Sequence, residues 1–323
     1  MLHTARGRLS VTYAQLAAGF FDSVFTRTSQ LLGFIPRHSF LAMAAIASTP
    51  YSRDLGDELR RIRESCTPHH GRAMAVHLGW DPSKVSDIEL GKARASDIDL
   101  VQYLATCGKD LHFVESFRRR YHHAFDLYFA QDNSNLRTLA MTETMATKIM
   151  SYDLIVIHGL LQTERYAREL FVDSHIEAPS DIDAYVEARM GRQTIMRRHN
   201  RPECVFYVHE LALRMRLGSA EIREDQYLRL LFNSHILRIV PAHITSFRSA
   251  CTLYEFPKAA PVVFTETEMA QVFAQEKAAV ARARRLFQRL DAVALDEEQS
   301  RSKLMEYVSG LREDSHDPGT DLA

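Results

Sequence analysis

The sequence has few cysteines, and they are not spaced as metal ligands or as a disulfide framework would be. Its four cysteines are scattered, with no CxxC pair among them. They are Cys66, Cys107, Cys204 and Cys251. This distribution argues against a zinc ribbon and favours reduced thiols in a cytoplasmic protein.

The chain also lacks an excess of charge of one sign. Its 323 residues carry a formal net charge of -1, so any affinity for nucleic acid must come from a local arrangement of cations. The hydrophobic fraction of 46% is ample for the cores of two domains of ordinary size. No apolar run is long enough to span a membrane, so no membrane partner is expected.

Residues 1–50 form an N-terminal extension whose status is open. Arg6 and Arg8 precede an uncharged run, LSVTYAQLAAGFF, which loosely imitates a signal peptide but is too short and too polar to cross a membrane. Two interpretations remain: an extra N-terminal helix, or residues upstream of a true start at Met43, ahead of STPYSRDLGDEL. We favour the second.

The stretch LGWDPSKVSDIELGKARAS, residues 78–96, predicts a helix over 82–89. Asp81 is a typical N-cap residue, and the proline that follows costs no hydrogen bond at a first helical position. Val85 and Ile88 lie three apart and can face a core. The outward positions are then Ser83, Lys84, Ser86 and Asp87.

The residues before this helix predict a second helix and a tight turn. Met74 and Leu78 make an apolar pair four residues apart. Gly79 follows directly, where the end of a helix favours a left-handed residue. Helix, tight turn and capped helix together make the helix-turn-helix pattern.

Further helices are predicted on both sides of this pair. Leu55, Leu59 and Ile62 fall at helical spacing in SRDLGDELRRIRES, and Ser96 can cap a fourth helix with Gly108 as its stop. We place an all-α helix-turn-helix domain at 51–110, and a connecting helix and linker at 111–135 that ends in the DNSN cluster.

Beyond this boundary the pattern becomes α+β. Helical segments are predicted over 160–171, 181–198, 220–232, 270–291 and 297–310, and the β-rich runs are CVFYVHE, ILRIVP, CTLYEFP and PVVFTETE. Four strands with short breaks predict a small antiparallel sheet. Residues 136–312 are read as an α+β effector or partner-binding domain, and 313–323 as a disordered tail. The fold class is α+β, mostly helical.

Residues 53–108 resemble the Xre/Cro type of helix-turn-helix, in which a run such as LGWSQSKVSRIENGRRRPS forms the turn, the recognition helix and the following loop. GLLQTERYAREL at 159–170 and VEARMGRQTIMRR at 186–198 are similar to the domain of unknown function that follows this motif in actinobacterial WhiJ-like regulators. The resemblance covers about residues 53–312. It implies a transcriptional regulator, for which double-stranded DNA is the expected partner. We expect no cofactor and no metal.

The recognition segment departs from the family pattern. His70 and Gly71 stand where a threonine and a glutamine are common, Pro82 where a glutamine is common, and Asp87 where a basic residue is common. These changes remove expected contacts, so altered specificity and weakened DNA binding are both open. The predicted DNA-binding residues are Arg72, Pro82, Ser83, Lys84, Ser86, Asp87, Lys92 and Arg94.

Two further residues are predicted to be structural. The resemblance implies that Arg63, late in the first helix, pairs with Glu89 at the end of the recognition helix. The sequence also shows no catalytic motif. His69–His70 and His122–His123 are pairs of adjacent residues, and adjacent residues do not share a helix face as two metal ligands four residues apart would. The chain is therefore not expected to be an enzyme.

Two functions remain in view. The first is a sequence-specific, homodimeric regulator whose C-terminal domain senses an unknown small molecule or a partner protein. The resemblance allows a small acidic partner, because such regulators are often encoded beside one. The second is an antitoxin-like interaction module whose helix-turn-helix no longer reads DNA. The feature that discriminates between the two functions is the surface formed by Ser83, Lys84, Ser86 and Asp87.

Overall fold

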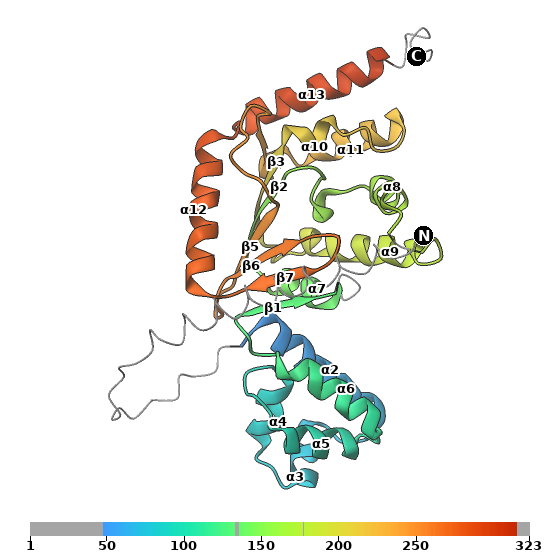
Figure 1. Ribbon diagram of the computed structural model, residues 1–323, viewed down its shortest axis with the longest axis vertical. Helices are drawn as coiled ribbons and strands as arrows, with labels where there is room; N and C mark the ends of the chain where they lie inside the picture. Colours follow the sequence, from blue (N-terminus) through green and yellow to red (C-terminus); the bar gives the residue numbers. More distant parts are fainter. Residues whose placement is uncertain (1–47, 133–135, 177, 315–323) are drawn as a thin grey trace, which may run out of the picture. The chain divides into compact units, whose positions relative to one another are not determined.

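The computed structural model describes residues 48–132, 136–176 and 178–314 (Figure 1). Nearly all of the N-terminal extension lies outside these residues, and so does Met43, the alternative start that the sequence suggests. The same is true of most of the DNSN cluster and of the predicted tail. Among the described residues, no helix has the length and apolar character needed to cross a membrane.

The first described region is helical, as the sequence predicts. Thr49 accepts the Ser52 N–H while the Ser52 hydroxyl accepts the Thr49 N–H, so a capping box starts the first helix. Leu55 and Leu59 are fully buried in this region. Its helices are α2 (Pro50–Cys66), α3 (Gly71–Leu78), α4 (Pro82–Glu89), α5 (Asp97–Thr106) and α6 (Leu111–His122).

The remainder combines seven strands with helices. The strands are β1 (Tyr128–Gln131), β2 (Lys148–Asp153), β3 (Glu203–His209), β4 (Leu237–Val240), β5 (Cys251–Glu255), β6 (Val262–Glu266) and β7 (Gln271–Ala274). The α-helices are α7 (Leu136–Met145), α8 (Glu164–Ser174), α9 (Ile182–Arg192), α10 (Glu210–Arg214), α11 (Ala220–Phe232), α12 (Lys277–Val293) and α13 (Glu297–Asp314). Three short 3-10 turns are η1 (Gly159–Leu161), η2 (Gln193–Arg197) and η3 (Ser234–Ile236).

The strands form one mixed sheet in the order β1-β7-β6-β5-β2-β3-β4. The α+β class is confirmed, but the prediction of a small antiparallel sheet is wrong. Strands β2, β3 and β4 are parallel, because the chain returns through helices between them. The helix predicted over 270–291 also begins later, at Lys277, because residues 271–274 pair as β7.

Helices cover both faces of the sheet (Figure 1). On one face, Phe287 of α12 packs with Tyr152 and Tyr207. On the other, Ile149 and Phe206 belong to a core shared with α7, α8, α11 and α13. The alternation of Ile149 and Tyr152 between the two faces follows from the period of two residues in a strand.

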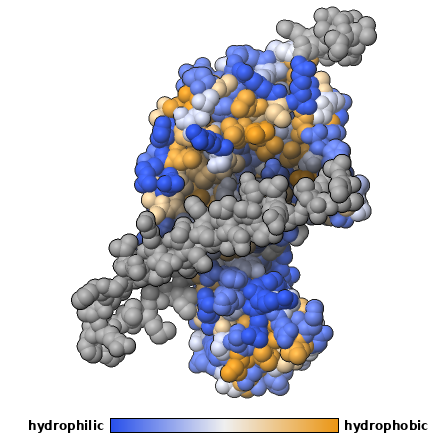
Figure 2. All heavy atoms as spheres, viewed as in Figure 1, coloured by the Kyte–Doolittle hydropathy of each residue, from blue (hydrophilic) through white to orange (hydrophobic). Residues whose placement is uncertain are grey.

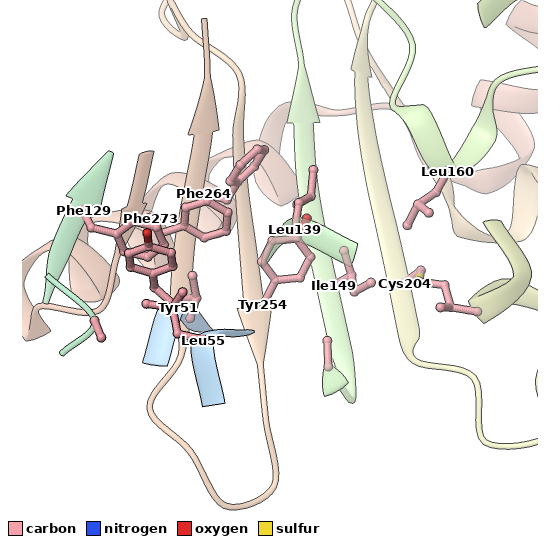
Figure 3. Close-up of a cluster of buried hydrophobic side chains, with 14 of the residues drawn as sticks. Tyr51, Leu55, Phe129, Leu139, Ile149, Leu160, Cys204, Tyr254, Phe264 and Phe273 are labelled. Atoms are coloured by element: carbon pink, nitrogen blue, oxygen red, sulfur yellow. The ribbon is translucent and has the colours of Figure 1, made fainter. Parts of the chain in front are cut away.

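A stack of aromatic rings joins α2 to the edge of this sheet (Figure 3). The ring of Tyr51 lies 4.8 Å from that of Phe129, and Phe129 lies 4.8 Å from Phe273, measured between centroids. The ring of Phe264 packs beside this stack, 5.0 Å from Phe273 and tilted by 59° against it. The first helix and the sheet therefore share one hydrophobic core.

Candidate nucleic-acid interface

Helix α3 and the turn after it have the geometry that the sequence predicts. The Nδ1 atom of His70 accepts the Ala73 N–H at 3.3 Å and caps α3. Met74 is fully buried, whereas Arg72 is exposed. Gly79 ends the helix with φ 70°, and its neighbour Trp80 donates its N–H to the Ala75 carbonyl.

Helix α4 presents a polar face outward. Asp81 Oδ1 accepts the Ser83 N–H at 2.7 Å, and hydrogen bonds from Ser83 hold the pKa of Asp81 below its usual value. Val85 is fully buried and Ile88 is 2% exposed. Pro82, Ser83 and Ser86 are exposed, as a surface that faces a groove requires.

Lys84 is held by the protein. Its ammonium lies 2.6 Å from Asp99 Oδ1 and 4.3 Å from the centre of the Trp80 ring. Burial raises the pKa of Asp99, but hydrogen bonds from Lys84 and Ser96 outweigh it and leave the pKa below its usual value. Because 40% of the Lys84 side chain is exposed, a phosphate can still compete with Asp99 for the ammonium.

Asp87 is half-buried on the same helix. Among the residues that the structure describes, its carboxylate forms no ion pair or hydrogen bond. Its main-chain carbonyl accepts the N–H groups of Lys92 and Ala93 at 2.7 and 3.1 Å. These two bonds hold the start of the loop, which carries Lys92 and Arg94, against the end of α4, which carries Asp87.

Lys92 and Arg94 are the exposed cations after α4. The Arg94 guanidinium lies 5.1 Å from the centre of the Phe125 ring, and Lys92 forms no ion pair within the described part of the chain. Both charges are therefore available to phosphate groups. The surrounding segment is close to neutral, because residues 53–96 hold eight Lys or Arg against seven Asp or Glu.

Two glycines bring α2 close to the end of α4. A Cβ atom on Gly56 would lie 2.6 Å from the Glu89 carbonyl oxygen, and one on Gly91 would lie 2.4 Å from the Ser52 main chain. Gly91 also has φ +63°, which favours glycine. The position of α4 is thus set by α2.

The pair Arg63 and Glu89 strengthens the same contact. Arg63 Nε and Nη2 donate to the two carboxylate oxygens of Glu89 at 2.7 and 2.8 Å, and the Tyr103 hydroxyl donates to Oε1 at 2.6 Å. The Arg63 and Glu89 side chains are only 6% and 7% exposed. Hydrogen bonds to Glu89 raise the pKa of Arg63, and burial followed by the bond to Glu89 raises that of Tyr103.

The residues singled out from the sequence thus fall into three groups in the structure. It places Pro82, Ser83 and Ser86 outward on α4, engages Lys84 with Asp99, and buries Arg63 with Glu89. Sequence reasoning did not single out Asp99. The capping-box pattern that starts α5, Ser96 with Asp99 three residues later, was the available signal.

The family comparison falls on the second part of the chain. A family model described as "Domain of unknown function (DUF5753)" matches residues 136–306, which is just over half of the sequence. No curated protein and no solved structure matches the chain.

Proposed function

The chain belongs to the DUF5753 family, and we propose that it is a DNA-binding transcriptional regulator. One observation carries the proposal: α4 follows α3 through a tight turn and exposes Pro82, Ser83 and Ser86 while its apolar side chains are buried. In this function α4 lies in the major groove of double-stranded DNA, as a recognition helix does. We propose a cytoplasmic location for a protein with this function.

The proposed contacts are of two kinds. Lys92 and Arg94, with Arg72 on α3, contact phosphates and set the position of the helix on the duplex. Ser83, Ser86 and Asp87 contact base edges. Lys84 joins the phosphate contacts by exchanging Asp99 for a phosphate oxygen.

Asp87 is proposed to provide discrimination rather than affinity. A carboxylate accepts from the N4 amino group of cytosine and disfavours bases that present only acceptors. Replacing Asp87 with arginine should raise the affinity for random duplex. It should also steepen the slope of log affinity against log salt concentration by about one, the change expected for one added phosphate contact. The ratio of specific to random binding should fall about tenfold, because one base contact contributes about 1–3 kcal/mol of discrimination.

Fluorescence anisotropy over a salt series measures these quantities for random duplex and for a preferred site, obtained by selecting bound fragments from a random duplex library. Asp173→Arg is the matched control, because it makes the same change of charge at an exposed position of α8. It should leave the ratio unchanged. If Asp87→Arg and Asp173→Arg change binding alike, Asp87 affects DNA only through net charge and the discrimination proposal is wrong.

We also propose that the protein acts as a homodimer. A nearly neutral domain offers few phosphate contacts, and two copies on a palindromic site double them. Helix α5 exposes Ile98 at 71% and Val101 at 41%, three residues apart, and Leu111 at the start of α6 is 71% exposed. Apolar surface is visible on the helical region in Figure 2. A second copy is the occupant that the proposed symmetric site requires.

The contacts of α7 support a sensing role for the second part of the chain. Arg137 Nη2 lies 3.0 Å from Asp54 Oδ1 on α2, and the Thr138 hydroxyl donates to Asp54 Oδ2 at 2.8 Å. Near its other end, α7 carries Glu143, which forms a buried pair with Arg192 of α9. A small-molecule effector or a small acidic partner protein that binds within residues 136–306 and moves α7 can therefore shift α2, and through α2 the position of α4.

One observation favours the alternative, an antitoxin-like module that does not read DNA. Lys84, the cation nearest the centre of the outward face of α4, is already neutralised by Asp99. If the wild-type chain shows no preferred duplex and Lys84→Ala changes nothing measurable in DNA binding, the interaction module becomes the better account.

A further inference from the structure

A cavity of about 330 Å³ lies at the carboxyl end of β2. Its walls come from the segment after β2, from α8 and α9, and from the adjoining ends of β5 and β6. Val156 and Ile176 line it and are 39% and 57% exposed, so apolar surface faces the opening. The volume is at the low end of the range for pockets that hold small molecules.

Arg189 of α9 lines this cavity and forms no ion pair with a carboxylate among the described residues. Its Nη1 donates to the neutral Gln162 Oε1 at 2.9 Å, and its guanidinium lies 4.6 Å from the centre of the Phe171 ring. Burial and the neighbouring Arg192 lower the pKa of Arg189 to about 10, so it remains charged at neutral pH. Glu266 and Glu143 attract this charge and so oppose the lowering of its pKa, but neither carboxylate forms an ion pair with Arg189 among the described residues. A partly buried cation without a directly bonded counter-ion is costly to the protein.

Arg192, the other arginine of the cavity, differs from Arg189 because it has a carboxylate partner. Arg192 also lines the cavity, but its Nε and Nη2 donate to the two carboxylate oxygens of Glu143 at 2.8 and 2.7 Å. Its charge is therefore neutralised within the fold. Arg189, three residues earlier on α9, has most of its donors left for an external acceptor.

His158 supplies a second donor. It is 8% exposed and lines the cavity, and its Nδ1 accepts the Leu160 N–H at 3.3 Å. Burial, followed by repulsion from Arg192 and Arg189, lowers the pKa of His158 to about 3. The neutral ring therefore carries its proton on Nε2, and this N–H has no hydrogen-bond acceptor among the described residues.

The acidic residues of the cavity limit the charge of an occupant. Asp153 accepts the Ser151 hydroxyl at 2.7 Å, and burial raises its pKa to about 7. Glu266 and Glu268 are exposed at the cavity wall. They disfavour a ligand with several negative charges, such as a nucleoside polyphosphate.

We propose that this cavity binds a small organic acid with one negative charge and an apolar body. The carboxylate accepts hydrogen bonds from Arg189 and from His158 Nε2, and the body packs on Val156, Leu170 and Ile176. Arginine suits this task because its planar donors match the two oxygens of a carboxylate. The proposal goes beyond DNA binding and does not depend on it, since all residues that line the cavity lie within 136–268 and none belongs to α2–α6.

Isothermal titration of the full chain tests this with phenylacetate, indole-3-acetate and the neutral isostere phenylacetamide. The two acids should bind, and phenylacetamide should bind at least about tenfold more weakly than phenylacetate, as loss of a charge-assisted pair predicts. Arg189→Met should weaken the acids by about the same factor and leave the amide unchanged. Arg168→Met is the matched control, because Arg168 pairs with Asp183 on the surface and does not line the cavity.

A thermal unfolding scan separates binding from folding. Arg189→Met replaces a cation without a carboxylate partner by an apolar chain of similar length, so the midpoint should stay the same or rise. Arg189→Lys, which keeps the charge but loses the planar fork, should bind the acids with intermediate strength. The proposal is overturned if neither acid binds at millimolar concentration, if phenylacetamide binds as well as phenylacetate, or if Arg168→Met weakens binding as much as Arg189→Met.

Discussion

The buried pair Arg63 and Glu89 gives the sharpest test of how α4 is held. Each side chain is less than a tenth exposed. Removing Arg63 leaves the Glu89 carboxylate with only the Tyr103 hydroxyl, and removing Glu89 leaves Arg63 with the exposed Glu64 at 3.4 Å and the His69 carbonyl. We expect Arg63→Met and Glu89→Leu each to lower the free energy of unfolding by about 3–5 kcal/mol. The double variant leaves no unpaired charge and should lose less than either single variant.

Urea unfolding measured by tryptophan fluorescence follows this directly. Trp80 is the only tryptophan, and its ring centroid lies 6.4 Å from that of Tyr103, which donates to Glu89. Arg60→Met is the control, because Arg60 pairs with Asp57 at the surface of the same helix and should change stability by less than about 1 kcal/mol. If the double variant loses the sum of the two single losses, the two charges do not depend on each other and the reasoning is wrong.

Three further predictions concern other parts of the molecule. Gly91→Ala should destabilise the helical region by at least about 2 kcal/mol in urea unfolding, whereas Gly108→Ala, with similar φ but open space, should cost about 1 kcal/mol; equal losses would contradict the close approach. Ile98→Asp should shift the mass measured by light scattering from dimer to monomer while the helical circular dichroism stays that of the wild type, and an unchanged dimer would contradict a place for Ile98 in the interface. Burial raises the pKa of Asp153 from 3.8 to about 7, so the folded chain retains a proton in this window and loses stability as the pH rises through it. The advantage of Asp153→Asn in free energy of unfolding should therefore grow up to about pH 7 and then level off, and a difference independent of pH would contradict it.

The helical region could be predicted from the sequence because its signals are local. Gly79 at a helix end, the cap at Asp81 and the spacing of Val85 and Ile88 are all read within a dozen residues. The contact between Arg63 and Glu89 spans 26 positions, and its prediction came from resemblance rather than from spacing.

The sheet and the state of Lys84 could not be predicted in the same way. Strands β1 and β7 have four residues each, too few for a clear alternation, and the parallel pairing of β2 with β3 depends on how the helices between them pack. Helical periodicity places Lys84 on the outer face, but it cannot show that Asp99 on the next helix meets it there. Likewise, His158 and Arg189 come together only through the fold.

The central claim, that α4 reads DNA, is tested most directly by selection of bound fragments from a random duplex library at physiological salt, followed by sequencing. The wild-type chain should enrich two half-sites about 10–10.5 base pairs apart, or a multiple of that spacing. A variant with Ser83→Ala and Ser86→Ala, both exposed positions, should remain folded by Trp80 fluorescence and lose the enrichment at the bases that α4 contacts. A folded wild-type chain that enriches no sequence would contradict the claim.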